Sequence, residues 1–322
     1  MESESFSAMN TFMTVKSYGS KARAANQEVE KEIQGLEKIL STTIEGSDIY
    51  GLNSAKGPGP AEFSVHSETA FLIDKSLKFY ELTAGAFNPA LYPVIREWGF
   101  TSGEYKVPEA GRIQELLKFT DFSRISVTYN NSNQKYRVQY PAGLQLDFGA
   151  IGKGYAGDVA IEKLRAAGIK SALLDFGGNI QVLGCKPDGS KWTVGIKNPW
   201  GGDPVAAVKL QDSCMITSGG YERFFTGEDG KKYIHIFDGA TGRPVENELE
   251  SVTIICREGL YGDALSTALF VMGLDKAVDF WQHSARDFDF AIITKDKGLV
   301  YSAPLEKNIS LLFDFDSVRV VE

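Results

Sequence analysis

Apolar residues recur every three or four positions in several stretches of the chain, which is the period of amphipathic helices. In the first stretch, Val29, Ile33, Leu36 and Leu40 share one helical face. The pattern predicts five helices, at residues 21–40, 68–82, 109–119, 263–272 and 276–283. The residues between the first two, 47–61, are rich in Gly, Pro and Ser and predict a loop.

Short runs in which apolar and polar residues alternate predict strands. They lie at residues 9–18, 124–129, 136–140, 172–183, 192–196, 206–210, 215–217, 233–237, 252–256, 290–294 and 299–302. Turn sequences such as Pro187-Asp188-Gly189 separate them, and helices do not alternate with them in the second half. We therefore expect an α+β protein with a large, mostly antiparallel sheet and flanking helices.

Composition and charge narrow the class of protein. The chain has 322 residues, of which 43% are hydrophobic, so it can bury a substantial core. Its formal net charge is −8 and it has no dense Lys/Arg stripe, which argues against a broad nucleic-acid face. Three distant cysteines, Cys185, Cys214 and Cys256, form neither a zinc signature nor a disulfide framework, and we expect buried thiols.

No apolar run approaches the roughly 20 residues that span a membrane, and no signal peptide is recognisable. The polar residues 1–8 are expected to be a disordered or cloning-derived leader, and residues 9–322 a single domain. Such a start fits an export signal that has been removed. We therefore expect a location at the outer face of the cytoplasmic membrane or in the periplasm, with a cytoplasmic enzyme as the alternative.

Residues 146–158 are rich in glycine and contain Lys153. We expect a glycine-rich turn between a strand and a helix, which is a common way to hold a phosphate. The spelling Gly152-Lys153-Gly154-Tyr155-Ala156-Gly157, with Asp175 further on, also matches a dinucleotide-binding fingerprint. The strands that follow do not alternate with helices, so we reject a Rossmann fold.

Two further residue groups could carry chemistry. On a helix, Asp263 and Thr267 lie four residues apart on one face, and a carboxylate with a hydroxyl suits Mg²⁺ shared with substrate phosphates. The alternative is a helix cap and a packed threonine. His235 lies in an apolar strand, where it is either a catalytic base or a satisfied core histidine.

Taken together, the motifs resemble the FAD:protein FMN transferase family, the ApbE-type flavin transferases. The matching pieces are Met9-Asn10-Thr11, Gly85-Ala86-Phe87-Asn88-Pro89, Trp98-Gly99-Phe100, Asp147 with Gly149-Ala150-Ile151, Lys153-Gly154-Tyr155-Ala156 and Asp158, Gly177-Gly178-Asn179, Ser218-Gly219-Gly220-Tyr221-Glu222-Arg223, His235-Ile236 with Asp238, Thr241-Gly242 and Pro244, and Asp263-Ala264-Leu265-Ser266-Thr267. They follow the family's order along the chain, and the resemblance also implies an ApbE-like architecture related to the T-fold.

The resemblance implies a role for each matching position. The carbonyl of Ala150, with Asp263 and Thr267, would hold Mg²⁺ on the FAD pyrophosphate, and Ser266 falls in the same helical turn. His235 would be the base near the phosphoryl acceptor. FAD would contact Met9, Ala86, Phe87, Asn88, Asp147, Lys153 and Ile236.

The chain departs from the family pattern at four positions. Asn88 stands where the family often has Asp, Ile234 replaces the first of two histidines, and Gly239 replaces a proline. Thr43 stands where an aromatic residue is frequent. None of these positions belongs to the implied metal ligands, but they affect the flavin-ring and acceptor sides.

The resemblance implies Mg²⁺-dependent transfer of FMN from FAD to a Thr or Ser hydroxyl of a partner flavoprotein, with release of AMP. Two alternatives share the same FAD ligands: an FAD pyrophosphatase that yields FMN and AMP, and a non-catalytic FAD-binding protein. Many relatives are lipoproteins outside the cytoplasmic membrane, which agrees with the expected location.

Overall fold

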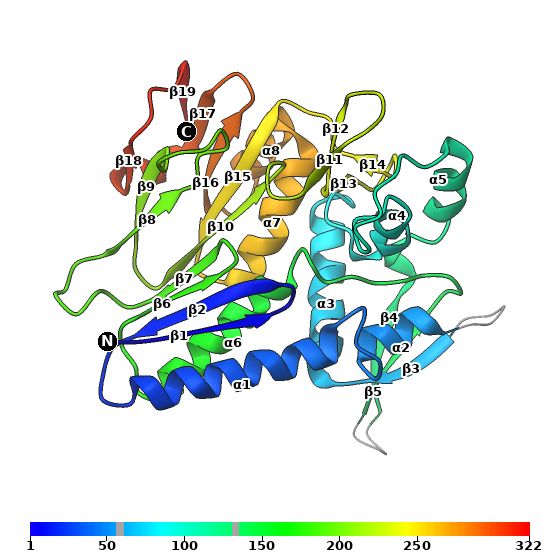
Figure 1. Cartoon of the computed structure of the whole chain (residues 1–322), viewed down its shortest axis with the longest axis horizontal. Coiled ribbons are helices and arrows are strands. Elements are labelled where there is room, and N and C mark those ends of the chain that lie inside the picture. The colour runs from blue at the N-terminus through cyan, green and yellow to red at the C-terminus, as the bar shows by residue number, and fades with distance from the viewer. Residues whose placement is uncertain (56–60, 131–134) are drawn as a thin grey trace. The chain divides into compact units, whose positions relative to one another are not determined.

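The computed structural model describes residues 1–55, 61–130 and 135–322 (Figure 1). The chain divides into two compact units. Unit 1 comprises Met1–Gln34, Ile151–Tyr221 and Asn247–Glu322, and unit 2 comprises Gly35–Ala150 and Glu222–Glu246. Helix α1 (Ala22–Leu40) begins in unit 1 and ends in unit 2. That residues 9–322 act as a single domain stays a prediction.

Unit 1 is built on a nine-stranded sheet. Its strands are β1 (Glu2–Ala8), β2 (Thr11–Ser17), β6 (Ala172–Phe176), β7 (Asn179–Leu183), β10 (Ser213–Gly219), β15 (Leu249–Cys256), β16 (Asp289–Thr294), β17 (Gly298–Ser302) and β19 (Ser317–Val321). They lie side by side in that order. All neighbours are antiparallel except β17 and β19, which are parallel.

Helices α6 (Gly152–Ala166) and α7 (Gly259–Met272) pack against one face of this sheet, and α8 (Leu274–His283) follows α7 (Figure 1). Side chains alternate between the faces of a strand. On β10, Cys214 and Ile216 point toward α7, where a Cβ on Gly262 would lie 3.4 and 3.0 Å from them. Met215, between them, points to the opposite face.

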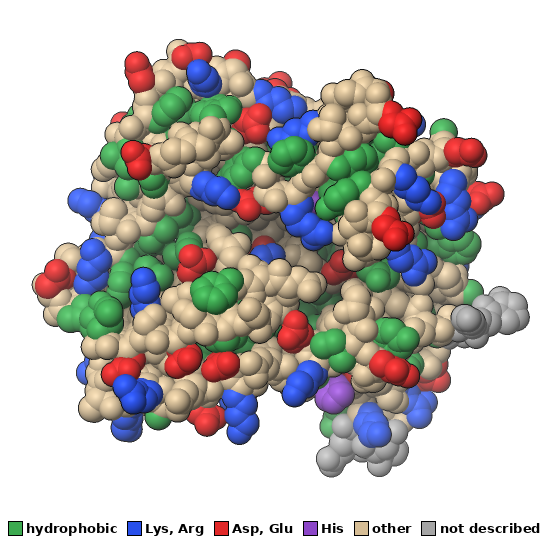
Figure 2. Space-filling model, viewed as in Figure 1, with side chains coloured by type: hydrophobic (Ala, Val, Ile, Leu, Met, Phe, Trp, Pro, Cys, Tyr) green, Lys and Arg blue, Asp and Glu red, His purple; other side chains and the backbone are tan. Residues whose placement is uncertain are grey.

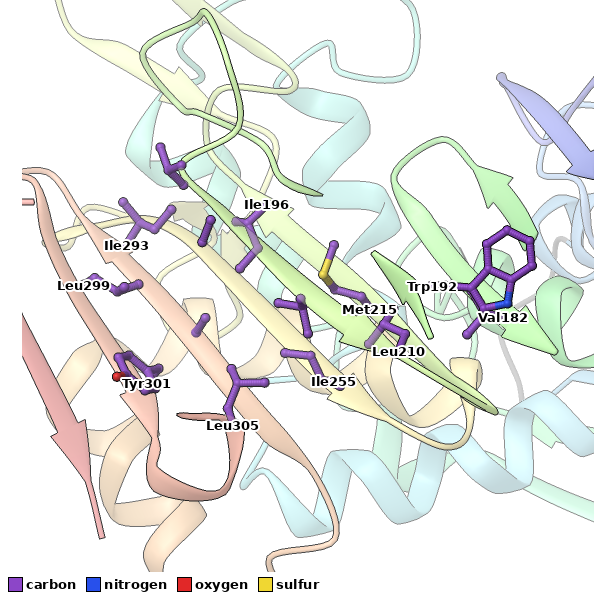
Figure 3. Close-up of a cluster of buried hydrophobic side chains, with 14 residues drawn as sticks. Val182, Trp192, Ile196, Leu210, Met215, Ile255, Ile293, Leu299, Tyr301 and Leu305 are labelled. Atoms are coloured by element: carbon purple, nitrogen blue, oxygen red, sulfur yellow. The ribbon is translucent and has the colours of Figure 1, made fainter. Parts of the chain in front are cut away.

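A smaller sheet covers the opposite face of the large one. It consists of β8 (Trp192–Ile196), β9 (Ala206–Leu210) and β18 (Ile309–Leu311), in the order β18-β9-β8. Figure 3 shows the cluster of side chains that includes Met215 and Ile255 from the large sheet and Ile196 and Leu210 from the small one. The middle of the large sheet, at β10 and β15, is therefore covered on both faces, which fixes the register of these two strands.

Unit 2 combines short helices with small sheets. Its elements are α2 (Asp48–Ser54), α3 (Ser67–Leu82), α4 (Tyr92–Glu97), α5 (Ala110–Leu117), β3 (Ala61–Val65), β4 (Ser126–Asn130), β5 (Lys135–Tyr140), β11 (Phe224–Thr226), β12 (Lys232–Ile234), β13 (Phe237–Asp238) and β14 (Arg243–Pro244), with short 3₁₀ turns at Pro89–Leu91 and Phe122–Arg124. A cluster around Trp98 and Phe237 forms one core. The indole Nε1 of Trp98 donates to the carbonyl of Gly242 at 3.1 Å, so even this buried polar atom is satisfied.

The predicted fold class is confirmed: the protein is a mixed α+β structure with a large, mostly antiparallel sheet and flanking helices. The five predicted helices correspond to α1, α3, α5, α7 and α8. No described helix of the chain is long and apolar enough to cross a membrane.

Two expectations about local structure are wrong. The stretch expected to be a loop contains α2, whose first turn is capped by Ser47: the Ser47 hydroxyl accepts from Tyr50 N at 3.0 Å. Residues 56–60 of that stretch lie outside the described residues. The start of the chain is not disordered either, because residues 2–8 form β1 and pair with β2 along its whole length.

The glycine-rich stretch forms the expected turn before a helix only at residues 149–151, and the helix begins earlier than expected. Helix α6 begins at Gly152, so Gly154 and Gly157 lie inside its first two turns. Gly157 faces Gln181 of β7, and a Cβ there would lie 2.1 Å from the Gln181 amide nitrogen. Packing against this side chain leaves no room for a Cβ, and it outweighs the low helix propensity of glycine.

Candidate functional site

Helix α7 carries the carboxylate and hydroxyls expected to bind a metal. Asp263 and Thr267 are separated by about one helical turn and therefore share a face. Asp263 is buried, with 5% of its surface exposed, whereas Thr267 is partly exposed. Ser266 is fully buried, so it lies on a more enclosed side of the same turn.

The Asp263 carboxylate is held by the start of α6. Its Oδ2 accepts a hydrogen bond from Gly154 N at 2.8 Å. Gly154 lies in the first turn of α6, where backbone N–H groups have no partner within the helix. The bond fixes the orientation of the carboxylate, and Oδ1 accepts no hydrogen bond from the described part of the chain. Oδ1 is therefore the oxygen available to a cation.

Ser218, near the end of β10, links the two hydroxyls of α7. Its Oγ lies 2.9 Å from Ser266 Oγ and 3.2 Å from Thr267 Oγ1. Ser266 donates its only proton to the Asp263 carbonyl at 3.0 Å, so Ser218 must donate to Ser266. Ser218 Oγ can then accept a hydrogen bond from the Thr267 hydroxyl. In that arrangement the lone pairs of Thr267 Oγ1 point away from Ser218. This chain of hydroxyls is compatible with Thr267 as a cation ligand.

The same chain of hydrogen bonds leaves Ser266 less suited to bind a metal. Its hydroxyl is fully buried and engaged with both Ser218 and the backbone of Asp263. The geometry fits a residue that supports its neighbours. Its assignment as a direct ligand stays a prediction.

A second polar network lies beside Asp263. Gln181 Nε2 donates to the Gly154 carbonyl at 3.0 Å and contacts Asn179 Oδ1 at 3.4 Å. Asn179 is 1% exposed, and its Nδ2 has no partner among the described residues. A buried donor without an acceptor is costly, so this amide is suited to an acceptor that the chain does not supply. Lys153 adds a positive charge in the first turn of α6.

This arrangement fits Mg²⁺. No group of three or more His, Cys, Asp or Glu side chains suited to a metal occurs among residues 1–55, 61–130 and 135–322. Mg²⁺ commonly takes one or two carboxylates together with substrate phosphates, and it does not require a complete protein cage. One carboxylate and one hydroxyl on α7 therefore match a metal shared with a phosphorylated substrate.

In unit 2, the turn after α3 contains Ala86, Phe87 and Asn88. The Phe87 side chain is 1% exposed and packs edge-on against Phe79, with ring centroids 5.8 Å apart. Because the whole residue is in the core, the assignment of Phe87 as an FAD contact stays a prediction. The Asn88 side chain accepts from Ala90 N at 2.9 Å and donates to the Thr120 carbonyl at 3.0 Å, so it stabilises the turn itself.

Two other expected residues are connected to this turn. Asp147 N donates to the Pro89 carbonyl at 3.0 Å, and Asp147 Oδ1 accepts from Gly149 N at 2.7 Å. Gly239 lies against Asn88: a Cβ there would be 3.6 Å from Asn88 Nδ2. The structure thus brings the Asn88 turn, the Asp147 loop and the segment after His235 together within unit 2.

The backbone carbonyl of Arg223 contacts His235 at two points. The backbone N and the ring Nδ1 of His235 each lie 3.1 Å from the carbonyl oxygen of Arg223. A carbonyl can only accept, so Nδ1 carries the proton and Nε2 carries the lone pair of the neutral ring. Ile236, next in the chain, is buried and its carbonyl accepts from Val245 N at 2.9 Å. His235 is partly exposed. Its ring is in the tautomer that a general base needs.

The expected residues fall into two groups, one in each unit. Unit 1 holds Met9, Lys153, Asp263, Ser266 and Thr267, and unit 2 holds Ala86, Phe87, Asn88, Asp147, Ala150, His235 and Ile236. Met9 and Asn10 form the β1–β2 turn with φ values of 50° and 58°, a region that residues with a side chain seldom adopt. Ala150 is the last residue of its unit before α6.

Sequence reasoning missed three supporting residues: Asp158, Gln181 and Ser218. Asp158 accepts from Gly259 N and Leu260 N at the start of α7, at 2.6 and 2.8 Å. Ser218 and Asp158 lie in or beside motifs that the family comparison highlights, but their partners are 48 to 102 residues away. Only the folded chain reveals those pairings.

The surface charge agrees with the composition. On the face shown in Figure 2, Lys and Arg side chains are interspersed with Asp and Glu and do not gather into one basic surface. An anionic ligand therefore depends on local groups, such as the helix start that carries Lys153 and Gly154.

Comparison with known proteins places these features in context. The sequence profile described as the ApbE family matches residues 9–292. A FAD:protein FMN transferase of Treponema pallidum is 34% identical over 308 residues, which cover 91% of this chain and 83% of the relative.

Solved structures agree with the sequence comparison. The ApbE protein of Thermotoga maritima superposes with a TM-score of 0.85 at 30% identity, covering 95% of this chain and 98% of that one. The apo form of the flavinyl transferase ApbE of Pseudomonas stutzeri gives a TM-score of 0.80 at 29% identity, covering 91% of each chain.

Proposed function

The chain belongs to the ApbE family, and from this premise we propose that it is an Mg²⁺-dependent FAD:protein FMN transferase. The acceptor is a Thr or Ser hydroxyl of a partner flavoprotein, and the second product is AMP. The observation that carries the proposal is the arrangement on α7, where Asp263 and Thr267 are oriented by Gly154 and Ser218. Such an arrangement suits a metal that is shared with a pyrophosphate.

We assign the metal ligands to Asp263 Oδ1, Thr267 Oγ1 and the Ala150 carbonyl, with Ser266 as their support. Mg²⁺, when bound, neutralises the charge on the bridging phosphates and on the leaving AMP. Lys153 and the N–H groups at the start of α6 add positive potential for the same phosphates. Besides Lys153, FAD contacts are assigned to Met9, Ala86, Phe87, Asn88, Asp147 and Ile236.

Phosphoryl transfer requires positioning and charge neutralisation more than covalent catalysis. In the proposed step, the acceptor hydroxyl oxygen attacks the phosphorus of the FMN half of FAD. A new P–O bond forms, the bond to the bridging oxygen breaks, and AMP leaves with that oxygen. His235 Nε2 takes the proton of the attacking hydroxyl, while the Nδ1 bond to Arg223 keeps the ring in the required tautomer.

The two alternative functions differ from FMN transfer in what happens to FAD. In an FAD pyrophosphatase, water takes the place of the protein hydroxyl and the products are FMN and AMP. In an FAD-binding protein, the nucleotide is retained. The oriented His235 favours an enzyme over a storage protein, because storage needs no general base. A location outside the cytoplasmic membrane stays a prediction.

One experiment separates the three. The protein is incubated with FAD, Mg²⁺ and a flavoprotein domain that carries an Asp followed within a few residues by the acceptor Thr or Ser. The mass of the acceptor and the amount of AMP are then measured. A gain of one FMN with equimolar AMP supports transfer. AMP without labelling supports hydrolysis, and retained FAD without either product contradicts both enzymatic proposals. An acceptor with Ala at the Thr or Ser position serves as the matched control.

A further inference from the structure

Helix α7 lacks a cap of its own. Its N-cap residue, Glu258, makes no side-chain hydrogen bond to the helix. The cap comes instead from α6: the Asp158 carboxylate accepts from Gly259 N at 2.6 Å and from Leu260 N at 2.8 Å. Two of the four unpaired N–H groups at this helix start are thus satisfied by one residue of a neighbouring helix.

Helix α6 shows the reverse relationship. Its N-cap residue, Ile151, has no side chain that can accept a hydrogen bond. The acceptor at its first turn is Asp263 of α7, whose Oδ2 binds Gly154 N at 2.8 Å. Each helix therefore places a carboxylate at the start of the other, and each carboxylate lies in the favourable potential of a helix N-terminus.

The two helix starts are also in direct backbone contact. A Cβ on Gly154 would lie 2.2 Å from the Gly259 carbonyl oxygen and 2.8 Å from Asp263 Cβ. A Cβ on Gly259 would lie 1.8 Å from Gln181 Nε2. Because the two backbones approach so closely at Gly154 and Gly259, the two Asp158 hydrogen bonds restrict how α7 can shift or rotate against α6.

From this geometry we propose that Asp158 is a positioning residue for metal binding: it holds α7 so that Asp263 Oδ1 and Thr267 Oγ1 are aligned for one cation. The inference rests on the proposed function, because it concerns the same metal ligands. Asp158 does not touch the cation in this proposal. It acts through Gly259 and Leu260, four and three residues before Asp263 respectively.

A purely structural cap would behave differently. Loss of an ordinary N-cap costs about 0.5–2 kcal/mol of stability and leaves ligand affinity unchanged. A residue that orients metal ligands changes affinity: removing such partners typically weakens metal binding about 10- to 100-fold. Metal affinity at constant fold therefore distinguishes the two roles.

The test uses Asp158→Asn, which keeps the size of the side chain and one acceptor oxygen but replaces the other with a donor. Mn²⁺ serves as the probe, and its affinity is measured by electron paramagnetic resonance in the presence of FAD. We expect affinity to fall about 10- to 100-fold, while FAD affinity in EDTA, measured by flavin fluorescence, changes less than about twofold. Amide hydrogen exchange at Gly259 and Leu260 should become faster.

The matched control is Asp48→Asn. Asp48 is the buried first residue of α2, and its carboxylate caps the start of α3, where it accepts from His66 N and Thr69 Oγ1, both at 2.7 Å. It should lose stability without losing Mn²⁺ affinity. If Asp158→Asn folds and binds Mn²⁺ as tightly as wild type, Asp158 is a cap only and the inference is wrong.

Two further measurements cover the cases in which Asp158→Asn alone gives no answer. If Asp158→Asn does not fold, Asp158→Glu is used, which keeps the charge but displaces it by one carbon; wild-type Mn²⁺ affinity in that variant contradicts the inference. Mn²⁺ binding by the wild type is measured first. A wild type that binds no Mn²⁺ with FAD overturns the proposed metal site itself, a result that differs from a loss seen only in the variants.

Discussion

The ring Nδ1 of His235 and the backbone N of the same residue both lie 3.1 Å from the carbonyl oxygen of Arg223. One acceptor thus fixes both the strand end and the imidazole tautomer. His235 lies between β12 and β13, and this bond together with the partial exposure of the residue supports the proposed role as a base.

Replacing His235 with Asn should separate orientation from base catalysis. The Asn amide keeps a donor near the position of Nδ1 but has no atom at Nε2. We expect FMN transfer to fall about 10²- to 10⁴-fold, because this is the usual contribution of a general base. FAD affinity should stay within about twofold. The measurement is the rate of AMP release with acceptor present. His283→Asn, a change on the exposed end of α8, is the control, and an equal loss in both variants would contradict the assignment.

Replacing Thr267 with Val removes the hydroxyl at nearly constant volume. We expect the Mg²⁺ concentration for half-maximal activity to rise about tenfold, the equivalent of one lost ligand worth about 1.4 kcal/mol. Thr267→Ser should restore the wild-type value. Thr253→Val is the control, because Thr253 Oγ1 pairs with Thr217 Oγ1 at 2.8 Å between strands β15 and β10. An unchanged Mg²⁺ requirement in Thr267→Val would exclude Thr267 as a ligand.

Two glycine-to-alanine changes should have opposite effects on stability. Gly154→Ala places a Cβ 2.2 Å from the Gly259 carbonyl oxygen, and the resulting overpacking should cost about 1–3 kcal/mol. Gly35→Ala, inside α1, meets nothing within 4 Å and should stabilise the fold by about 0.5–1 kcal/mol. Urea unfolding measures both. Equal effects at the two positions would show that the close approach of α6 and α7 is not tight in solution.

The pH dependence of stability should depend on Asp158. Burial, and to a lesser extent the nearby Glu258 and Asp263, raise the pKa of this carboxyl from 3.8 to about 6, although its bonds to Leu260 and Gly259 act in the opposite direction. The folded state therefore binds the proton more tightly than the unfolded state. The contribution of the protonated group is fully present below pH 3.8 and is lost as pH rises through about 6.

The shift corresponds to at most roughly 3 kcal/mol, and solvent screening of this half-buried group reduces that value. In Asp158→Asn this titration is absent. The stability of wild type relative to the variant should therefore decrease between pH 4 and pH 6. Urea unfolding at pH 4, 5, 6 and 7 measures the difference, and a difference that is constant with pH would contradict the raised pKa.

The three cysteines should differ in reactivity. Cys185 is partly exposed, whereas Cys214 and Cys256 are buried with their Sγ atoms 3.2 Å apart. The hydrogen bond from Cys214, followed by burial, raises the pKa of Cys256 well above its ordinary value, so little reactive thiolate is present. Iodoacetamide at pH 8 should label Cys185 alone in the native protein and all three cysteines in urea. Rapid native labelling of two or more would contradict this burial.

The sequence predicts the long elements because their periodicity is strong. Residues 22–40 form α1 since Val29 and Ile33 repeat at helical spacing and are fully buried. Helix α2 is missed because it has only seven residues inside a stretch rich in Gly, Pro and Ser. The start of α6 is missed because Gly154 and Gly157 favour a turn locally, and only their contacts with Gly259 and Gln181 explain a helix there.

The sequence also predicts part of the candidate site. The four-residue spacing of Asp263 and Thr267 indicates a shared face, and family resemblance points to His235. The groups that orient them are not predictable from spacing, because Gly154 lies 109 residues from Asp263 and Ser218 lies 49 residues from Thr267. Phe87 illustrates the limit of resemblance, since its ring is in the core.

The exchange of carboxylates between α6 and α7 also constrains the order of folding. Neither helix can satisfy its first turn until the other has docked, and the hydrogen bonds that join them close loops of 101 to 109 residues. Closing such loops is entropically unfavourable and occurs late in folding. Metal-binding competence should therefore appear in the final cooperative step of refolding, after the local helices and hairpins have formed, so a partly folded chain would not capture the cation.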